Sequence, residues 1–452
     1  MMPSLPNELW WNIFAHAVPF GGDLAVVEPS SEQLYPFFQG SFSGFSDTHF
    51  VSTQLALWKS WDITVLNLMR VSRLWRGLAE PFLYSALYVE QEWRLRRFID
   101  SIKEKPRQAE QLRTLVVMPR SINGLTKPFC DGLVLQVLGL CHGVTAVVME
   151  SPMSSSPLYL FESHGSSRRL RLLSALGLLR DEFPVFMINF NNCATLQVLE
   201  LSVHDVGGRT LSSFPEHITF PSLHTLVLGY LDPISLGIVG KWELPSLKEL
   251  SIARWSPLQS IALIPLIQQS YERLEFLAVS THSFYDRKLN DIIRTPLIHL
   301  KHLTLGIPTP TQPFPPTQLA AKLVLCHVVT FGVYRVGWIT LGSIHAWVRF
   351  LTYMPHLRSV LTDVTTSLLE ECLKNSLPLL DFLRSFEEVL EARGVAFKGV
   401  TNDRSSFVPI KLLQRDSLEV STSLFSHNSR LISKILYQNG NLPLDNGNAN
   451  KQ

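Results

Sequence analysis

Apolar residues recur at helical spacing close to the start of the chain. Within residues 4–18, SLPNELWWNIFAHAV, the side chains of Leu5, Leu9 and Ile13 stand four positions apart, so they share one face of a helix. Ser4 is suited to the N-cap position, and a proline follows in the first turn, where its missing N–H costs nothing. The pattern predicts a short amphipathic helix.

A second helical pattern occupies residues 62–80, DITVLNLMRVSRLWRGLAE. Its apolar positions follow the helical period and are Leu68, Val71, Trp75 and Leu78. Pro81 comes next and is expected to end the helix, because proline has no N–H to donate. Between the two patterns, residues 19–61 are rich in Gly, Ser and Phe without a sustained period, which predicts an inserted loop.

The middle of the chain carries an internal repeat with the core L-x-x-L-x-L. Successive copies, 27, 24, 27 and 26 residues apart, start at Leu196, Leu223, Leu247, Leu274 and Leu300. Looser copies start at Leu112, Val144 and Leu357. The last two apolar positions alternate with the period of a strand and face one side of it, so one unit cannot cover its own apolar face. Stacked units bury those faces in a continuous column, which is the logic of a leucine-rich-repeat solenoid.

The predicted fold is therefore α/β, with an irregular solenoid and a curved parallel sheet over residues 91–375. Residues 377–393, LPLLDFLRSFEEVLEAR, have the period of an amphipathic helix, and we expect a C-terminal cap over residues 376–437. Residues 438–452 are polar and are expected to form a disordered tail. Residues 1–90 then form an N-terminal module.

Both halves of this module resemble the F-box family. LPNELWWNIF, residues 5–14, is similar to the opening of the F-box, which is usually L-P-x-E-L followed by an apolar helix. LMRVSRLWRGLAEPFLY, residues 68–84, is similar to the closing helix of the family, whose signature Val-x-Arg-x-Trp falls on Val71, Arg73 and Trp75. The chain departs from the family in the long 19–61 insertion, where the family has a short connection.

The resemblance implies a three-helix module that inserts its apolar faces into a Skp1-like adaptor, which joins a cullin and a RING subunit in a ubiquitin ligase. Carried over residue by residue, it marks as Skp1-binding candidates Leu5, Pro6, Leu9, Ile13, Val71 and Trp75. The insertion is compatible with docking, because loop-closure entropy rises only about 0.6 kcal/mol per doubling of loop length. The alternative is that both helices are ordinary core helices of a larger domain, since apolar stripes usually are.

Residues between the buried leucines of the repeats must point the other way and form a concave face. From this face we take as candidate substrate contacts Thr225, Val227, Glu249, Ser251, Phe276, Ala278, His302 and Thr304. The set has few charges, which suits a neutral protein surface better than a phosphate. The alternative is that the protein's own loops or tail fill this face.

Composition narrows the partners further. Forty Lys and Arg against 38 Asp and Glu leave a formal charge of +2, too small an excess to neutralise many phosphates, so no nucleic acid is expected. The five cysteines are scattered and include no C-x-x-C pair, which predicts neither a disulfide framework nor a zinc site. The apolar stretch 323–351 contains four His and Arg residues, so no membrane partner is expected. A cytoplasmic or nuclear location follows.

Motifs for catalysis are absent from the sequence: it has no G-x-S-x-G, H-E-x-x-H, Walker loop or G-x-G-x-x-G. We therefore expect no catalytic residue, cofactor or metal. The chain is predicted to be a non-catalytic adaptor of an SCF-type (Skp1–cullin–F-box) ubiquitin ligase, with a substrate protein held by the repeats. One alternative is a repeat scaffold unconnected with ubiquitin transfer. Another is a hydrolase or transferase in an irregular C-terminal α/β domain.

Overall fold

The computed structural model describes most of the repeat region and part of the N-terminal module. The described residues are 9–10, 13–14, 63–118, 121–122, 125–126, 131–150, 169–179, 183, 193–204, 218–229, 231–252, 260–280, 299–306, 328–334, 351–352, 354–365, 377–400 and 407–409. The predicted insertion 19–61 and tail 438–452 lie outside them, as do Leu5 and Pro6.

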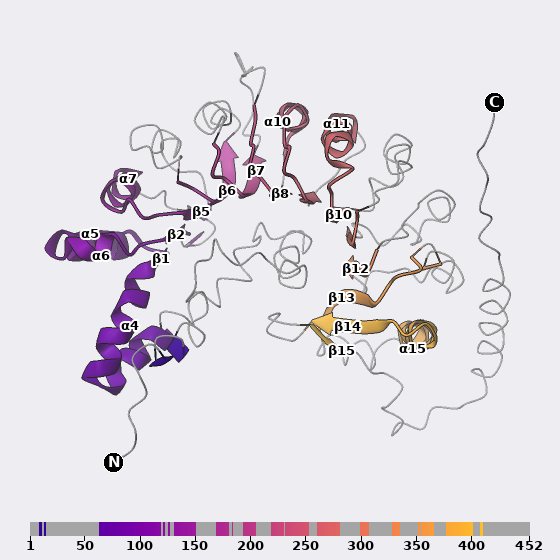
Figure 1. The fold of residues 1–452 in the computed structure, drawn as a ribbon, viewed down its shortest axis with the longest axis horizontal. Helices are drawn as coiled ribbons and strands as arrows, with labels where there is room; N and C mark the ends of the chain where they lie inside the picture. Colours follow the sequence, from indigo (N-terminus) through magenta and orange to yellow (C-terminus); the bar gives the residue numbers. More distant parts are fainter. Residues whose placement is uncertain are drawn as a thin grey trace.

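A single 13-stranded sheet runs through the described part of the chain as a curved arc (Figure 1). Its strands stand side by side in chain order, and every pair is parallel except the last, β14 with β15. The strands are β1 (Ala86–Val89), β2 (Thr114–Val117), β5 (Ala146–Glu150), β6 (Leu172–Leu179), β7 (Val198–His204), β8 (Thr225–Leu228), β9 (Glu249–Ile252), β10 (Phe276–Ser280), β11 (His302–Gly306), β12 (Thr330–Tyr334), β13 (Ser359–Thr365), β14 (Ala396–Val400) and β15 (Phe407–Pro409). A separate two-stranded sheet pairs β3 (Ser121–Ile122) with β4 (Leu125–Thr126).

Each L-x-x-L-x-L unit supplies one strand, which confirms the prediction of a repeat solenoid with a curved parallel sheet. The five clear copies give β7 to β11, and the three looser copies give β2, β5 and β13. Equivalent leucines pair in register across neighbouring strands and are at most 2% exposed: Leu199, Leu226, Leu250, Leu277 and Leu303. Stacking at this register removes each apolar face from water, which a single repeat cannot do.

Helices cover the outer, convex side of the arc (Figure 1). They are α5 (Glu92–Glu104), α6 (Pro106–Ala109), α7 (Asp131–Leu140), α10 (Pro233–Val239), α11 (Ser260–Ser270) and α15 (Leu377–Ala392). The main apolar core lies between these helices and the sheet and is continuous from Val89 to Phe397. The helix predicted over 377–393 is confirmed as α15, where Phe386 and Leu390 are buried. Two strands, β14 and β15, follow α15 and extend the sheet beyond the predicted solenoid range.

A ladder of backbone hydrogen bonds fixes the register at the entrance to the strands. The N–H just before one strand donates to the carbonyl of the equivalent residue in the previous repeat, so Thr145 donates to Arg113 and Arg171 donates to Thr145, both at 2.8 Å. The pattern continues through Gln197 and His224, again at 2.8 Å. These bonds satisfy backbone groups that would otherwise be unpaired between strand and turn.

The helical stretch after the insertion differs from its prediction. Residues 63–71 are helical, the helix breaks at Ser72, and α4 runs from Arg73 to Ser85. The prediction that Pro81 ends this helix is wrong, because α4 continues through it. Ser72 starts α4 instead: its backbone is extended and its hydroxyl accepts from the N–H of Trp75 at 3.1 Å. Ala79 and Phe82, on either side of Pro81, are 0% and 3% exposed in the cluster described next, so packing offsets the backbone hydrogen bond that proline removes.

The N-terminal helices share a second apolar cluster with the inner face of the first strands. Phe14 and Val65, 1% and 0% exposed, belong to the same cluster as Tyr88 of β1, Val116 of β2 and Val148 of β5. These strand residues alternate with those that face the main core, as the two-residue period of a strand requires. The N-terminal helices therefore close the first end of the concave face and are packed onto the solenoid.

Candidate interaction surfaces

Three aromatic rings join the two halves of the N-terminal module. The ring of Trp75 lies 5.0 Å from that of Trp10 and 5.1 Å from that of Phe14. The rings of Trp10 and Phe14 are 6.1 Å apart. The predicted apolar stripe contained Leu9 and Ile13 but not Trp10 and Phe14, although these two aromatic residues also stand four positions apart. Aromatic contacts thus bring together segments that the 19–61 insertion separates.

Of the six predicted docking residues, three are open to solvent. Leu9 is 46% exposed, Ile13 is 45% exposed and Val71 is 61% exposed. Trp75 is half-buried in the aromatic contact. The remaining two residues, in the first predicted turn, lie outside the described part of the chain.

Three further apolar side chains of the same helices are exposed. They are Ile63, Leu66 and Leu74, at 60%, 41% and 51%. With the three above they form what we call the N-terminal apolar surface, which consists of Leu9, Ile13, Ile63, Leu66, Val71 and Leu74. Of the nine large hydrophobic side chains exposed among the described residues, six belong to it. Scattered apolar residues are normal on a protein surface, whereas several on neighbouring helices are typical of a site of interaction.

The predicted substrate contacts stand on one face of the sheet, in two rows across the strands. Pairing puts Thr225, Glu249, Phe276 and His302 in the first row, and Val227, Ser251, Ala278 and Thr304 in the second. Periodicity alone was sufficient to assign them to this face. Six of the eight are buried, however, with exposed fractions between 0% and 7%: Thr225, Val227, Ser251, Phe276, Ala278 and Thr304. Most of the predicted contacts are therefore not open to solvent, and substrate binding at them stays a prediction.

A buried carboxyl group lies on this face at Glu200, in β7. The side chain is 4% exposed, and its Oε2 accepts a hydrogen bond from the hydroxyl of Ser174, on the neighbouring strand, at 2.6 Å. Its Oε1 is buried with no hydrogen-bond partner in the part of the chain that the structure describes. Burial disfavours the charged form and raises the pKa of Glu200 to about 7, although the bond from Ser174 opposes the rise.

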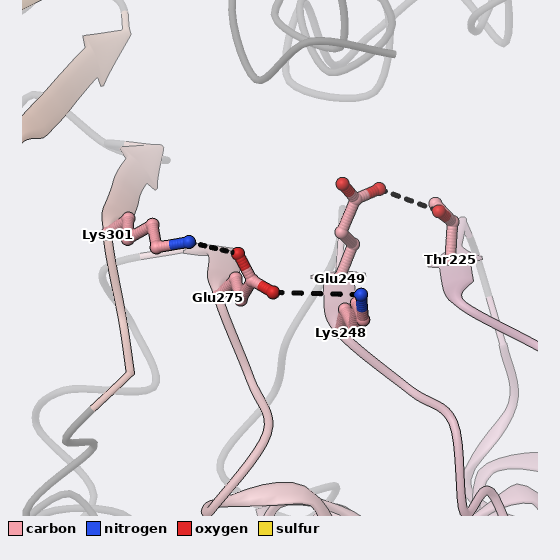
Figure 2. Close-up of polar contacts among 5 residues, drawn as sticks. All are labelled: Thr225, Lys248, Glu249, Glu275 and Lys301. Carbon is pink, nitrogen blue, oxygen red and sulfur yellow. Dashed lines mark hydrogen bonds and ion pairs between the residues drawn. The ribbon is translucent and has the colours of Figure 1, made fainter. Parts of the chain in front are cut away.

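Glu249 is a second such carboxyl group, two strands further along. Figure 2 shows its side chain directed at Thr225, whose hydroxyl donates to Oε2 at 2.6 Å. Burial is the largest cause of a pKa raised to about 7, and the negative charge of Glu275 adds to the rise. Burial thus shifts two carboxyl groups on the concave face towards the protonated form.

Glu275 takes part in a different arrangement, in which three neighbouring repeats are linked by charge. It lies between Lys248 and Lys301, whose Nζ atoms are 3.9 Å and 2.6 Å from its two oxygens (Figure 2). The hydrogen bond from Lys301 is the main reason why the pKa of Glu275 is lowered. All three side chains are partly or largely exposed, so the pairs add little to stability.

The described residues include no group of three His, Cys, Asp or Glu side chains that could hold a metal ion. Two of the described cysteines, Cys141 and Cys193, are buried thiols. Burial raises the pKa of the Cys141 thiol to about 12, so it is not a reactive thiolate at neutral pH. Across the same residues, every helix is too short or too polar to cross a membrane.

Comparisons with known proteins add little to this description. No protein-family model matches the sequence, and no curated protein matches it. Among solved structures, a Bacteroides fragilis protein determined by a structural genomics consortium is similar to this chain, with a TM-score of 0.30 and 10% identity. The match covers 64% of this chain and 70% of that one. A TM-score this low supports no argument, so the fold assignment rests on the strand order and register given above.

Proposed function

We propose that this protein is a substrate-recognition adaptor of an SCF-type ubiquitin ligase. In this proposal the N-terminal helices have the F-box role and bind a Skp1-like adaptor, through which a cullin and a RING subunit join. The repeats bind a substrate protein, and ubiquitin transfer is catalysed by the other subunits, in the cytosol or nucleus. The observation that carries the proposal is the N-terminal apolar surface, exposed on helices whose sequence resembles the F-box.

The geometry of that surface supports binding to a groove on a partner. Leu9 and Ile13 are four residues apart, and Ile63 and Leu66 are three apart, which is the spacing of anchors on a helix that lies in an apolar groove. Full burial of one such side chain is worth about 1.5–3 kcal/mol, so a few of them supply much of the free energy of a stable complex.

Packing of the N-terminal helices onto the sheet also supports an adaptor. An adaptor acts by holding a substrate near a charged ubiquitin carrier, so a fixed relation between its two binding ends matters more than any reactive side chain. Phe14 and Val65 are buried against the first strands, which restricts hinge motion between the helices and the repeats. The buried middle of the concave face agrees less well with substrate binding there, and the substrate contacts stay a prediction.

The test is binding of the full-length chain to an immobilised Skp1-type adaptor. The double variant Leu9→Asp with Val71→Asp puts charge on the apolar surface at two exposed positions, so it should fold and lose binding by about 100-fold or more. Ile234→Asp, at an apolar residue of α10 that is 50% exposed, is the matched control and should bind like the native chain. Unchanged affinity of the double variant would count against the proposal.

Recovery of a cullin decides between the proposal and a simple scaffold. The native chain, purified with its partners from cells, should bring a cullin and a RING subunit together with the Skp1-like protein. The double variant should lose all three while it keeps substrate proteins. Recovery of the Skp1-like protein without any cullin would favour a scaffold that has no part in ubiquitin transfer.

A further inference from the structure

Arginines are interspersed with the N-terminal apolar surface. Residues 63–79 contain three of them, Arg70, Arg73 and Arg76, and neither Asp nor Glu. All three arginines are exposed. Arg70 and Val71 belong to the helical stretch 63–71, and Arg73 and Leu74 belong to α4, so both helices carry an exposed positive charge together with exposed apolar side chains.

None of the three arginines forms an ion pair within the part of the chain that the structure describes. Arg76 does donate from its Nε to the carbonyl of Met69 at 3.4 Å, which helps to close the end of the preceding helix. Elsewhere in the described residues, basic side chains do find carboxylates: Arg96 lies 2.6 Å from Glu92. Arg70 and Arg73 thus remain available to an outside partner.

Exposed arginines together with exposed apolar side chains favour one kind of partner surface. When an apolar surface becomes buried against a partner, an arginine beside it loses part of its hydration. A hydrogen-bond acceptor on the partner can replace the lost water, and a carboxylate matches the fork of the guanidinium best. A phosphate backbone also binds arginine, but it has no apolar surface against which the exposed apolar side chains of the same helices could be buried. A protein groove with carboxylates at its edge satisfies both kinds of side chain.

We infer that the N-terminal apolar surface fits a partner groove that is apolar in its centre and acidic at its rim, with Arg70 and Arg73 in contact with the rim carboxylates. This inference rests on the proposed function and adds to it the charge of the partner. Rim charges act mainly on the rate of association, which they raise by steering, and their effect is screened by salt. The two arginines also disfavour a basic partner.

The experiment measures association of the full-length chain with an immobilised Skp1-type adaptor at two salt concentrations. Arg70→Glu with Arg73→Glu should reduce the association rate constant about tenfold or more at about 50 mM salt, and the difference should shrink at about 500 mM. Lys241→Glu with Arg358→Glu makes the same change of charge at exposed positions in distant repeats. This control should stay within about twofold of the native chain.

The outcomes separate the inference from the proposed function. If the arginine variant and its control associate at the same rate while Leu9→Asp with Val71→Asp abolishes binding, the acidic rim is refuted and the proposed function stands. If the native chain does not bind the adaptor at all, both are refuted. If a single-stranded oligonucleotide binds the native chain and the arginine variant does not bind it, the arginines serve a nucleic acid and the inference is overturned.

Discussion

The indole of Trp10 lies 5.0 Å from the indole of Trp75, at an interplanar angle of 55°. The two residues belong to segments separated by the whole 19–61 insertion, yet their rings are in contact. Phe14 completes the junction and is 1% exposed. With these aromatic side chains turned inward, Leu9 and Ile13 are left on the outside, so the same packing that joins the helices also presents the apolar surface.

The aromatic junction predicts that replacing Trp75 destabilises the protein much more than replacing Trp93. Trp75→Ala should lower the free energy of unfolding by about 3 kcal/mol, because it removes the ring that both Trp10 and Phe14 contact. Trp93→Ala, at a residue 50% exposed, should cost less than about 1 kcal/mol, since it loses a cation–π contact with Arg97 and an exposed hydrogen bond to Gln91. Urea denaturation followed by circular dichroism measures both. Equal losses would contradict the aromatic junction.

The carboxyl group of Glu200 predicts a pH dependence of stability. Its pKa is about 7 in the folded protein and 4.5 is its ordinary value, so between these values the folded state binds more protons than the unfolded state. Stability from this group is therefore greatest below pH 4.5, falls as the pH rises to about 7, and is level above that. The total change is about 3 kcal/mol.

Glu200→Gln should remove most of that pH dependence, since a neutral amide has no charge to desolvate. The melting temperature of the variant, measured between about pH 5 and pH 8, should fall less on going to higher pH than that of the native chain. Glu275→Gln is the control, because the pKa of Glu275 is lowered and its side chain is partly exposed. An unchanged slope in Glu200→Gln would show that this carboxyl group is not buried in the neutral form.

The solenoid predicts a high cost for truncation of a single repeat leucine. Leu250 is fully buried between its partners Leu226 and Leu277, so Leu250→Ala should lose about 2–5 kcal/mol, as cavities in packed cores do. Leu140→Ala, at the end of α7 where the side chain is 39% exposed, should lose less than about 1 kcal/mol. Thermal melting compares the two, and similar melting temperatures would contradict a continuous core.

Deletion of residues 1–90 is expected to damage the repeats. It removes β1 and uncovers apolar side chains of the inner face, among them Val116 and Val148, which are 0% and 5% exposed in the intact chain. The truncated chain should therefore melt at a lower temperature and associate in solution. Deletion of the polar tail 438–452 should change neither property. Light scattering and thermal melting check both, and an equally stable monomer after the first deletion would show that the N-terminal helices are independent of the sheet.

Much of the repeat architecture follows from local pattern. Alternation of apolar residues after Leu196, Leu223 and Leu247 was enough to predict the strands and the face that each residue takes, because side-chain alternation is a property of the strand itself. The L-x-x-L-x-L motif did not mark the strands β6 and β12. In β6 the last motif position is Ala175, and in β12 the last two motif positions are Phe331 and Val333, so both depart from the leucine pattern, although they pair with their neighbours in the same register.

The exposure of residues in the N-terminal apolar surface was predictable in part. The motif residues Leu9 and Val71 are accessible, but nothing local indicated that Trp10 and Phe14 would form the buried side. Helical spacing is the same for the pair Leu9 and Ile13 as for the pair Trp10 and Phe14. Only the position of Trp75 decides which of the two pairs packs inward. Tertiary packing also explains why Pro81 does not end α4. Its neighbour Phe82 is buried in the second apolar cluster, which the local sequence does not indicate.

The amino-acid sequence alone determined that this chain stacks repeats into a parallel sheet, and which residue of each repeat points to which side. Only the tertiary structure decided which of those sides is open. Most of the described residues on the inner face of the sheet are buried, whereas several apolar side chains of the N-terminal helices are exposed. Periodicity is encoded within a few neighbouring residues, but coverage depends on segments far away in the chain, whose approach no local pattern specifies.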